Sequence, residues 1–275
     1  MDDVKLKVVD GWAVLPSSLR RPDGITPRFR IEFPAHAPDR GAIHLVINEF
    51  KGGYELATRN LLERLLRAGD LLIDVGAHWG FFTLQAVTHP AGNVRVAAFE
   101  PDPANAGILF RNLVINDVTP RVQLVCAACG GESIELAPLV SSSSMEHSVH
   151  GVSLTQPSER GPAKWVAVVS LDAALSFLPP ADPSPGRVIL KIDAEGYEPQ
   201  ILAGAKGLLD SGRVAAIIWE NGHADSAAMR AMVGDLTARG FSHQRPPGEN
   251  IDGPLLPFNP DEPYVGNVFS LRPDA

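Results

Sequence analysis

LLIDVGAHWGFFTLQAV, residues 71–87, is an apolar run that breaks at two glycines and then resumes as a second apolar run. The first run is typical of a buried strand, and the second has the length and composition of a short helix. Gly76 and Gly80 lie four residues apart at the break, so we expect a tight turn between the strand and the helix. Open α/β sheets bind their ligands at such turns, because these turns lie at the carboxyl ends of the strands.

The same alternation of strand and helix continues towards the C-terminus. Further apolar strands, with helices between most of them, are expected at residues 94–100, 122–129, 187–193, 213–220 and 264–273. Strands that are apolar along their whole length are typical of a mostly parallel sheet with helices on both faces. The sequence therefore predicts an α/β fold, with the glycine turn after the first of these strands.

The residues before the glycine turn are predicted to form an N-terminal extension and one helix. Residues 28–33 and 42–50 alternate apolar and polar side chains, as half-buried strands do, so we expect a hairpin-like pair. The leucines that follow form one stripe of a helix, which Gly69 is expected to end. We therefore divide the chain into an extension, residues 1–53, and one α/β domain, residues 54–275.

Two segments interrupt the alternation. Residues 130–170 contain a serine-rich run, and we expect short strands around a loop there. Residues 245–263 are rich in proline and glycine, which predicts a loop before the last strand, over the site.

Composition and charge exclude several classes of protein. The 275 residues carry a formal net charge of −8, with no run of Lys or Arg longer than two, which argues against nucleic acid as the main partner. No stretch approaches the roughly 18 apolar residues of a membrane span, and the first residues do not resemble a signal peptide. Two cysteines do not make a disulfide framework. We expect a cytoplasmic protein, whose oligomeric state the sequence leaves open.

The residues around the turn discriminate between cofactors. Asp74 precedes the turn, and Glu100 ends the next strand, where an acid can accept both hydroxyls of a ribose. A dinucleotide fingerprint has glycine where this chain has His78, because a pyrophosphate needs close approach of the backbone. S-Adenosylmethionine carries a sulfonium and an amino acid tail instead of a phosphate. The acidic turn without that glycine therefore favours S-adenosylmethionine over NAD.

Four stretches resemble the FkbM family of S-adenosylmethionine-dependent methyltransferases: DVGAHWG (74–80), FEPDPANAGILFRNL (99–113), VSLDAAL (169–175) and LKIDAEGYEPQILAGA (190–205). The resemblance extends from Tyr54 to Glu220. It implies a Rossmann-like class I methyltransferase fold with a mostly parallel seven-stranded sheet. It also implies O-methylation of a small-molecule or glycan acceptor, because members commonly methylate hydroxyls of sugars, polyketides or other natural products.

The resemblance places the cofactor on residues of the turn and of the next strand end. These are Asp74, Gly76, Ala77, His78, Gly80, Glu100 and Pro101. The turn of family members usually reads DVGANIG, and this chain differs from it at His78 and Trp79.

Methyl transfer to a hydroxyl needs an aligned nucleophile and a group that takes its proton. The candidate bases follow two predicted neighbouring strands. They are Asp193 and Glu195, at the end of the strand at residues 187–193, and His223, after the strand at residues 213–220. In a second route, Mg²⁺ would lower the pKa of the hydroxyl. Asp193, Glu220 and Asn221 offer oxygen ligands for it, in an arrangement that resembles catechol O-methyltransferases. The sequence leaves both routes open.

Two other functions remain as alternatives: a methyltransferase-fold binding module without catalysis, and a NAD-dependent oxidoreductase. Two smaller predictions concern structure. Cys126 and Cys129 are expected to be buried thiols, and Glu198 is expected to cap the helix that begins near Pro199.

Overall fold

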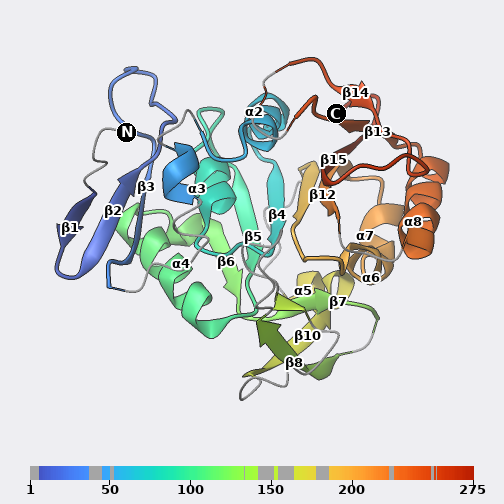
Figure 1. Cartoon of the computed structure of the whole chain (residues 1–275), viewed down its shortest axis with the longest axis horizontal. Coiled ribbons are helices and arrows are strands. Elements are labelled where there is room, and N and C mark those ends of the chain that lie inside the picture. Colours follow the sequence, from blue (N-terminus) through green and yellow to red (C-terminus); the bar gives the residue numbers. More distant parts are fainter. Residues whose placement is uncertain are drawn as a thin grey trace.

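The centre of the molecule is a large mixed sheet with helices on both sides (Figure 1). This computed structural model describes residues 6–36, 45–49, 53–132, 134–141, 152–153, 164–177, 186–222, 226–248, 251 and 253–275. Within them the strand order is β14-β13-β15-β12-β11-β4-β5-β6. In chain order these strands are β4 (Leu71–Val75), β5 (Arg95–Phe99), β6 (Val122–Val125), β11 (Val188–Ile192), β12 (Val214–Asn221), β13 (Ser242–Arg245), β14 (Leu256–Pro257) and β15 (Gly266–Leu271).

The directions of the strands agree with the sequence prediction. β6, β5, β4, β11 and β12 are parallel neighbours, and β15 is antiparallel to both β12 and β13. The α/β fold with a largely parallel sheet is therefore confirmed, but the sheet has eight strands among the described residues instead of seven. The two-residue strand β14 adds to its edge and lies within residues 245–263, which the sequence assigned to a loop.

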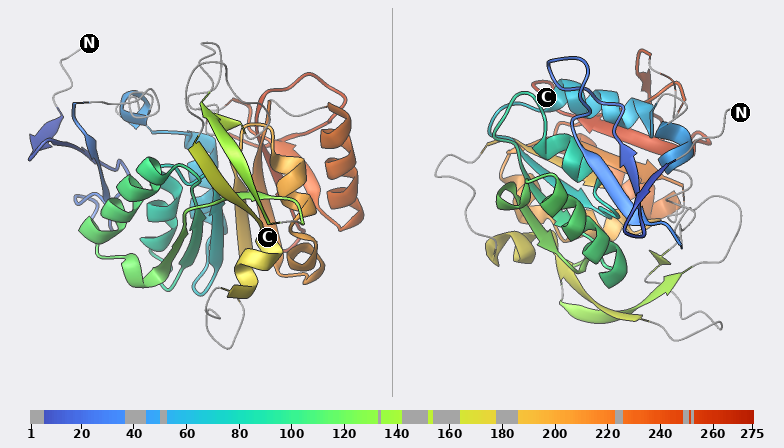
Figure 2. Two further views of the ribbon diagram at one scale, coloured as in Figure 1. Left: turned by 90° about the horizontal axis from the view of Figure 1, so that it is seen from below. Right: turned by 90° about the vertical axis from the view of Figure 1, so that its left-hand side faces the viewer.

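Each face of the sheet has its own hydrophobic core, because successive side chains of a strand point to opposite faces. Leu72 of β4 belongs to the core under α2, α3 and α4, whereas Ile73 and Val75 belong to the core under α6, α7 and α8. The left view of Figure 2 shows green α4 and orange α8 on opposite sides of the sheet. The helices are α2 (Leu56–Leu65), α3 (Phe81–Val87), α4 (Pro103–Ile115), α5 (Leu171–Phe177), α6 (Glu198–Ala203), α7 (Lys206–Asp210), α8 (Ser226–Ala238) and the 3-10 turn η1 (Thr119–Arg121).

The helices differ from the prediction mainly at their ends. α2 ends at Leu65 instead of near Gly69. The single helix expected after Pro199 is divided into α6 and α7, and at Gly204 between them a Cβ atom would overlap the carbonyl oxygen of Gly130. None of the helices in the described segments is long and apolar enough to span a membrane.

The strand predicted at residues 122–129 is divided between two sheets. β6 ends at Val125, and β7 begins at Ala128 in a small sheet of order β7-β10-β8-β9 among the described residues. Cys126 lies in the bend and is exposed, so the prediction that both thiols are buried holds only for Cys129. The strands of the small sheet are β7 (Ala128–Gly130), β8 (Glu135–Ser141), β9 (Val152–Ser153) and β10 (Lys164–Ser170).

The N-terminal residues form a further sheet, which is antiparallel. Its strands in the described part of the chain are β1 (Lys7–Val9), β2 (Trp12–Pro16) and β3 (Arg30–Pro34). The strand predicted at residues 42–50 is wrong where the structure describes it, because residues 45–49 are helical; residues 42–44 and 50 lie outside the described residues. Leu45 and Glu49 are buried, whereas Ile47 between them is 44% exposed, which fits a helix; in a strand residues 45, 47 and 49 would share one face.

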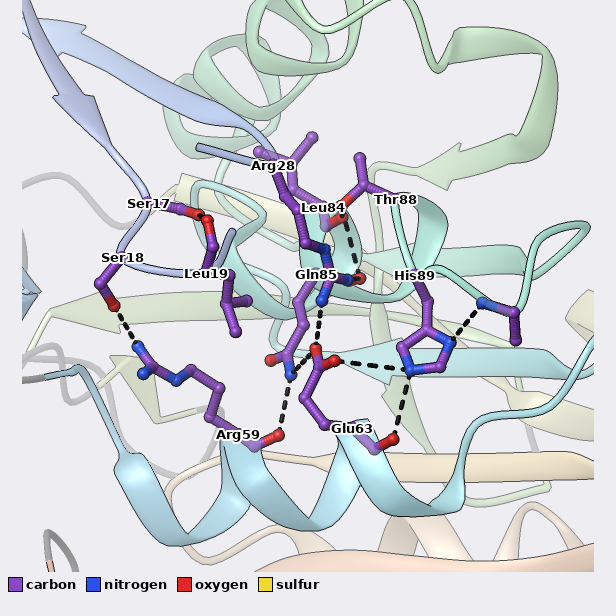
Figure 3. Close-up of polar contacts among 11 residues, drawn as sticks. Ser17, Ser18, Leu19, Arg28, Arg59, Glu63, Leu84, Gln85, Thr88 and His89 are labelled. Atoms are coloured by element: carbon purple, nitrogen blue, oxygen red, sulfur yellow. Dashed lines mark hydrogen bonds and ion pairs between the residues drawn. The ribbon is translucent and has the colours of Figure 1, made fainter. Parts of the chain in front are cut away.

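Polar side chains tie the N-terminal segment to α2 and α3 (Figure 3). Arg28, which is 5% exposed, donates hydrogen bonds to the carboxylate of Glu63 on α2 and to the carbonyl oxygen of Gln85 on α3. The side-chain amide of Gln85 donates to Glu63 and to the carbonyl oxygen of Arg59. These contacts anchor the extension on the α/β unit. The division of the chain at residue 53 stays a prediction.

Candidate functional site

The glycine turn brings the ends of two neighbouring strands into contact. It joins β4 to α3, and Gly76 (φ 77°), His78 (φ 49°) and Gly80 (φ 88°) have left-handed backbone conformations. A Cβ atom on Gly76 would overlap the carbonyl oxygen of Asp193, just after β11. Because only glycine permits this approach, the motif holds the turn directly against Asp193.

Asp74 lies on β4 just before the turn and is 1% exposed. Its Oδ2 accepts a hydrogen bond of 2.6 Å from the hydroxyl of Thr83 on α3. Its Oδ1 has no hydrogen-bond partner in the part of the chain that the structure describes. Burial raises the pKa of Asp74, and attraction to Lys191 opposes that rise. Buried polar atoms are rarely left unpaired, so a donor group of a ligand would fit at Oδ1.

Glu100, which follows β5, holds the turn from the other side. It is 5% exposed, and its Oε2 accepts a hydrogen bond of 2.8 Å from the backbone N–H of His78. Its Oε1 accepts one of 2.9 Å from the backbone N–H of Asp102. Burial raises the pKa of Glu100, and these amides oppose the rise. A carboxylate has about four acceptor sites, so roughly two remain for hydroxyls of a ligand.

The remaining residues predicted for the cofactor lie in the same place. The backbone N–H groups of Gly76 and Ala77 both donate to the carbonyl oxygen of Phe99, at distances of 2.9 and 3.0 Å. Pro101 is half-buried and follows Glu100 directly. All seven predicted positions therefore belong to β4, its turn or the adjacent end of β5, and their role in binding stays a prediction.

Carboxylates gather at the ends of β11 and β12. One oxygen atom from each of Asp193, Glu195 and Glu220 lies within 4.8 Å of the others, so these three acids could hold a cation. Lys191 on β11 is 3% exposed, and its Nζ donates a hydrogen bond of 3.1 Å to Oδ2 of Asp193. The cluster therefore combines several acids with a buried ammonium group.

Crowding changes the protonation of two of these acids. Burial, followed by repulsion from Asp193, raises the pKa of Glu195 to about 8. The same two causes raise the pKa of Glu220 to about 9. At pH 7 both side chains are therefore mostly protonated and neutral.

Glu198 supports the loop that precedes α6. Its Oε1 accepts hydrogen bonds from the backbone N–H groups of Ala194 and Gly196, at 3.2 and 3.4 Å. Burial raises its pKa to about 7, although these amides oppose the rise. The N-cap position of α6 is Tyr197, whose side chain makes no capping hydrogen bond, so the prediction that Glu198 caps the helix is wrong.

Two of the predicted catalytic or metal residues are not part of the carboxylate cluster as the structure describes it. The side-chain nitrogen of Asn221 donates a hydrogen bond of 2.6 Å to the carbonyl oxygen of Tyr264. His223 lies outside the described residues. Their roles stay predictions.

Sequence reasoning missed Lys191, which contacts the cluster most closely. Its ammonium group also lies 4.7 Å from the ring centroid of Phe82. A lysine within the buried strand VILKI is unusual, because buried charges need a partner, and this position could have been recognised from the sequence.

Comparisons with known proteins identify a family and several similar structures. The model of the methyltransferase FkbM domain family matches residues 74–242. The chain is similar to the crystal structure of the methyltransferase FkbM from Methylobacillus flagellatus KT, with 18% identity and a TM-score of 0.48 over 75% of this chain and 45% of that chain. This chain therefore spans less than half of that protein.

Two other solved structures are similar at lower identity. One is the O-methyltransferase from Bacillus cereus in complex with SAH, with 13% identity and a TM-score of 0.46 over 85% of this chain and 86% of that chain. The other is the precorrin-6y C5,15-methyltransferase from Geobacter metallireducens GS-15, with 14% identity and a TM-score of 0.40 over 78% and 87%. No curated protein sequence matches the chain. The family model covers more than half of the residues, and the chain therefore belongs to the FkbM methyltransferase family.

Proposed function

We propose that this chain is an S-adenosylmethionine-dependent methyltransferase that methylates a hydroxyl group of a sugar, a glycan or another natural product. The observation that carries the proposal is the contact between Gly76 and Asp193, which brings the glycine turn against the carboxylate cluster. A cofactor held by the turn would have its reactive end beside acids that can serve an acceptor.

The residues of the turn fit the cofactor chemically. The orphaned Oδ1 of Asp74 suits the ammonium group of an amino acid tail. The acceptor sites that remain on Glu100 suit two ribose hydroxyls. The carboxyl groups after β11 and β12 offer oxygen atoms to a positive sulfonium, whereas a pyrophosphate would need hydrogen-bond donors there.

Proton removal is the main chemical task of the chain itself. The bound cofactor supplies an electrophilic methyl group. Asp193 follows β11, where its carboxylate is held by Lys191, and we assign it the role of taking the proton of the acceptor hydroxyl. Glu195 lies beside it and becomes a base only as pH approaches about 8, the value to which its pKa is raised. His223 remains a further candidate base.

A second route to the same product uses a hard cation such as Mg²⁺. Asp193, Glu195 and Glu220 offer it oxygen atoms within 4.8 Å of one another, and a bound cation would lower the pKa of a hydroxyl. Chelation separates the two routes. Activity that is lost in EDTA and restored by Mg²⁺ supports the cation, whereas unchanged activity supports the base alone.

The cofactor is tested by thermal shift with S-adenosylhomocysteine against NADH. A ligand that prefers the folded state raises the melting temperature by mass action, and only S-adenosylhomocysteine is expected to do so. Stabilisation by NADH alone would support an oxidoreductase instead.

Catalysis is tested by transfer of a labelled methyl group from S-adenosylmethionine to a panel of hydroxylated sugars and natural products. Binding of the cofactor without transfer to any acceptor of the panel would favour the alternative of a binding module.

A further inference from the structure

The turn that we assign to the cofactor has a backbone that needs support. His78 is not glycine, yet its φ of 49° lies in the left-handed region, which costs energy for a residue with a Cβ atom. Glu100 stabilises this conformation from one side, through the N–H of His78. The next residue, Trp79, is held by contacts with the N-terminal sheet and with α4.

An aromatic stack continues from the turn into the N-terminal sheet. The rings of His78 and Trp79 have centroids 4.8 Å apart and an interplanar angle of 15°. Trp79 also stacks on Phe33 of β3, at 5.3 Å and 15°. Trp79 and Phe33 are each 2% exposed, so this contact is buried and specific to the extension.

Asn112 on α4 joins the same two segments through hydrogen bonds. Its side-chain nitrogen donates a hydrogen bond of 3.0 Å to the carbonyl oxygen of Trp79. Its side-chain oxygen accepts one of 2.8 Å from the backbone N–H of Glu32 on β3. Asn112 is fully buried, so all of its contacts are made inside the protein.

Asn116 lies four residues after Asn112 and also binds β3. None of its described hydrogen bonds reaches the glycine turn. Its oxygen accepts from the N–H of Arg30, and its nitrogen donates to the carbonyl oxygens of Arg30 and Asn112. Asn112 and Asn116 therefore both bind the edge of β3, but among the described hydrogen bonds only those of Asn112 link that edge to Trp79.

We propose that the N-terminal sheet positions the cofactor-binding turn, with Phe33 and Asn112 as positioning residues that act through Trp79. The inference rests on the proposed function, since it assigns the extension a part in cofactor binding. The proposal predicts that substitutions at Phe33 and Asn112 change the affinity for the cofactor, although neither residue is assigned a contact with the cofactor.

Two matched pairs of variants test this proposal by titration calorimetry with S-adenosylhomocysteine. Phe33→Leu removes the stack on Trp79, and its control is Phe29→Leu. Phe29 is 3% exposed and packs edge-on against Phe81, at 5.5 Å. Asn112→Ala removes the bond to the turn, and its control is Asn116→Ala.

Phe33→Leu and Asn112→Ala are each expected to weaken S-adenosylhomocysteine binding about tenfold, the scale of coupling between packed side chains. The two controls are expected to bind as the wild type does. At saturating cofactor the turnover number should stay close to that of the wild type, because only the affinity changes.

Melting temperatures without ligand separate positioning from simple loss of stability. Phe33→Leu and Phe29→Leu should lose similar amounts of stability, while only Phe33→Leu loses affinity for S-adenosylhomocysteine. Equal affinity for the members of each pair would overturn the proposal. If Phe33→Leu fails to fold, the asparagine pair decides alone. If the wild type itself does not bind S-adenosylhomocysteine, the proposed function fails instead.

Discussion

The ammonium nitrogen of Lys191 lies 3.1 Å from Oδ2 of Asp193, and Lys191 is buried on β11, between β12 and β4. Although burial opposes it, attraction to Asp193, Glu55 and Asp74 raises the pKa of Lys191. Lys191 therefore stays charged and balances carboxylates that belong to three different segments. It couples the stability of the fold to the geometry of the candidate site.

Lys191→Met should destabilise the protein strongly. Removal of one partner of a fully buried ion pair costs about 3–5 kcal/mol, and the loss here should lie near or below the lower end of that range because the side chain of Asp193 is 34% exposed. Urea unfolding measures this change. Lys206→Met is the control, because Lys206 pairs with Glu132 on the surface and should change stability little. Equal effects of the two substitutions would contradict the role of Lys191.

Much of the fold could be predicted from the sequence. Strands such as LLIDV and VAAIIWE are apolar except for one acidic residue near their end, and nearly continuous apolar runs are typical of strands buried on both faces. The glycine turn could be predicted because its backbone conformations exclude most residues. We could also expect Asp74, Glu100 and Asp193 at one edge of the sheet, because each lies at the end of a strand predicted to be parallel to the others.

Other features depend on contacts that a local pattern does not contain. The apolar run at residues 122–129 continues through a bend into a second sheet, and nothing in its composition marks the bend. Residues 45–49 form a helix that buries Leu45 in the core and pairs Glu49 with Arg59, a contact ten residues away in the sequence. The stack of Phe33 on Trp79 joins residues 46 positions apart.

Glu100→Ala should weaken S-adenosylhomocysteine binding by roughly 1.5–3 kcal/mol, the scale of hydrogen bonds to a charged group. Titration calorimetry measures this loss. The substitution should also lower the melting temperature without ligand, because Glu100 accepts the N–H groups of His78 and Asp102. Unchanged affinity in a folded variant would mean that the ribose binds elsewhere.

Glu220→Gln should stabilise the protein without ligand at alkaline pH. Burial and repulsion from Asp193 raise the pKa of Glu220 from 4.5 to about 9, so between these values the folded state holds a proton that the unfolded state has lost. Wild-type stability must then fall as pH rises through this window. Glutamine has no charge to bury and so removes this loss of stability. The melting temperature of the variant should rise by roughly 2–4 °C for each kcal/mol relieved at pH 8, and should not rise near pH 4.5.

Thermal melts of wild type and variant across pH 4.5–9 check this dependence. Glu132→Gln is the control of opposite sign, because the hydrogen bond from Lys206 lowers the pKa of Glu132. It should not gain stability at pH 8. A gain for Glu220→Gln that is the same at pH 5 and pH 8 would show that charge is not the cause.

Asp193→Asn should lower the rate of methyl transfer by about 10²–10⁴, the usual range for loss of a general base. The substitution keeps the shape of the side chain and removes its charge. Affinity for S-adenosylhomocysteine should change little, because the residues proposed to hold the cofactor lie at the ends of β4 and β5.

Single-turnover rates at saturating cofactor measure the effect, and Asp235→Asn on the exposed side of α8 controls for the loss of one acidic group. The same variant measured with the chelator separates the roles of Asp193. If the wild type is indifferent to EDTA and the variant is slow, Asp193 acts on the proton of the acceptor. If Asp193→Asn retains full activity, Asp193 serves only to hold Lys191 and the turn at Gly76, and the base must be found among Glu195 and His223.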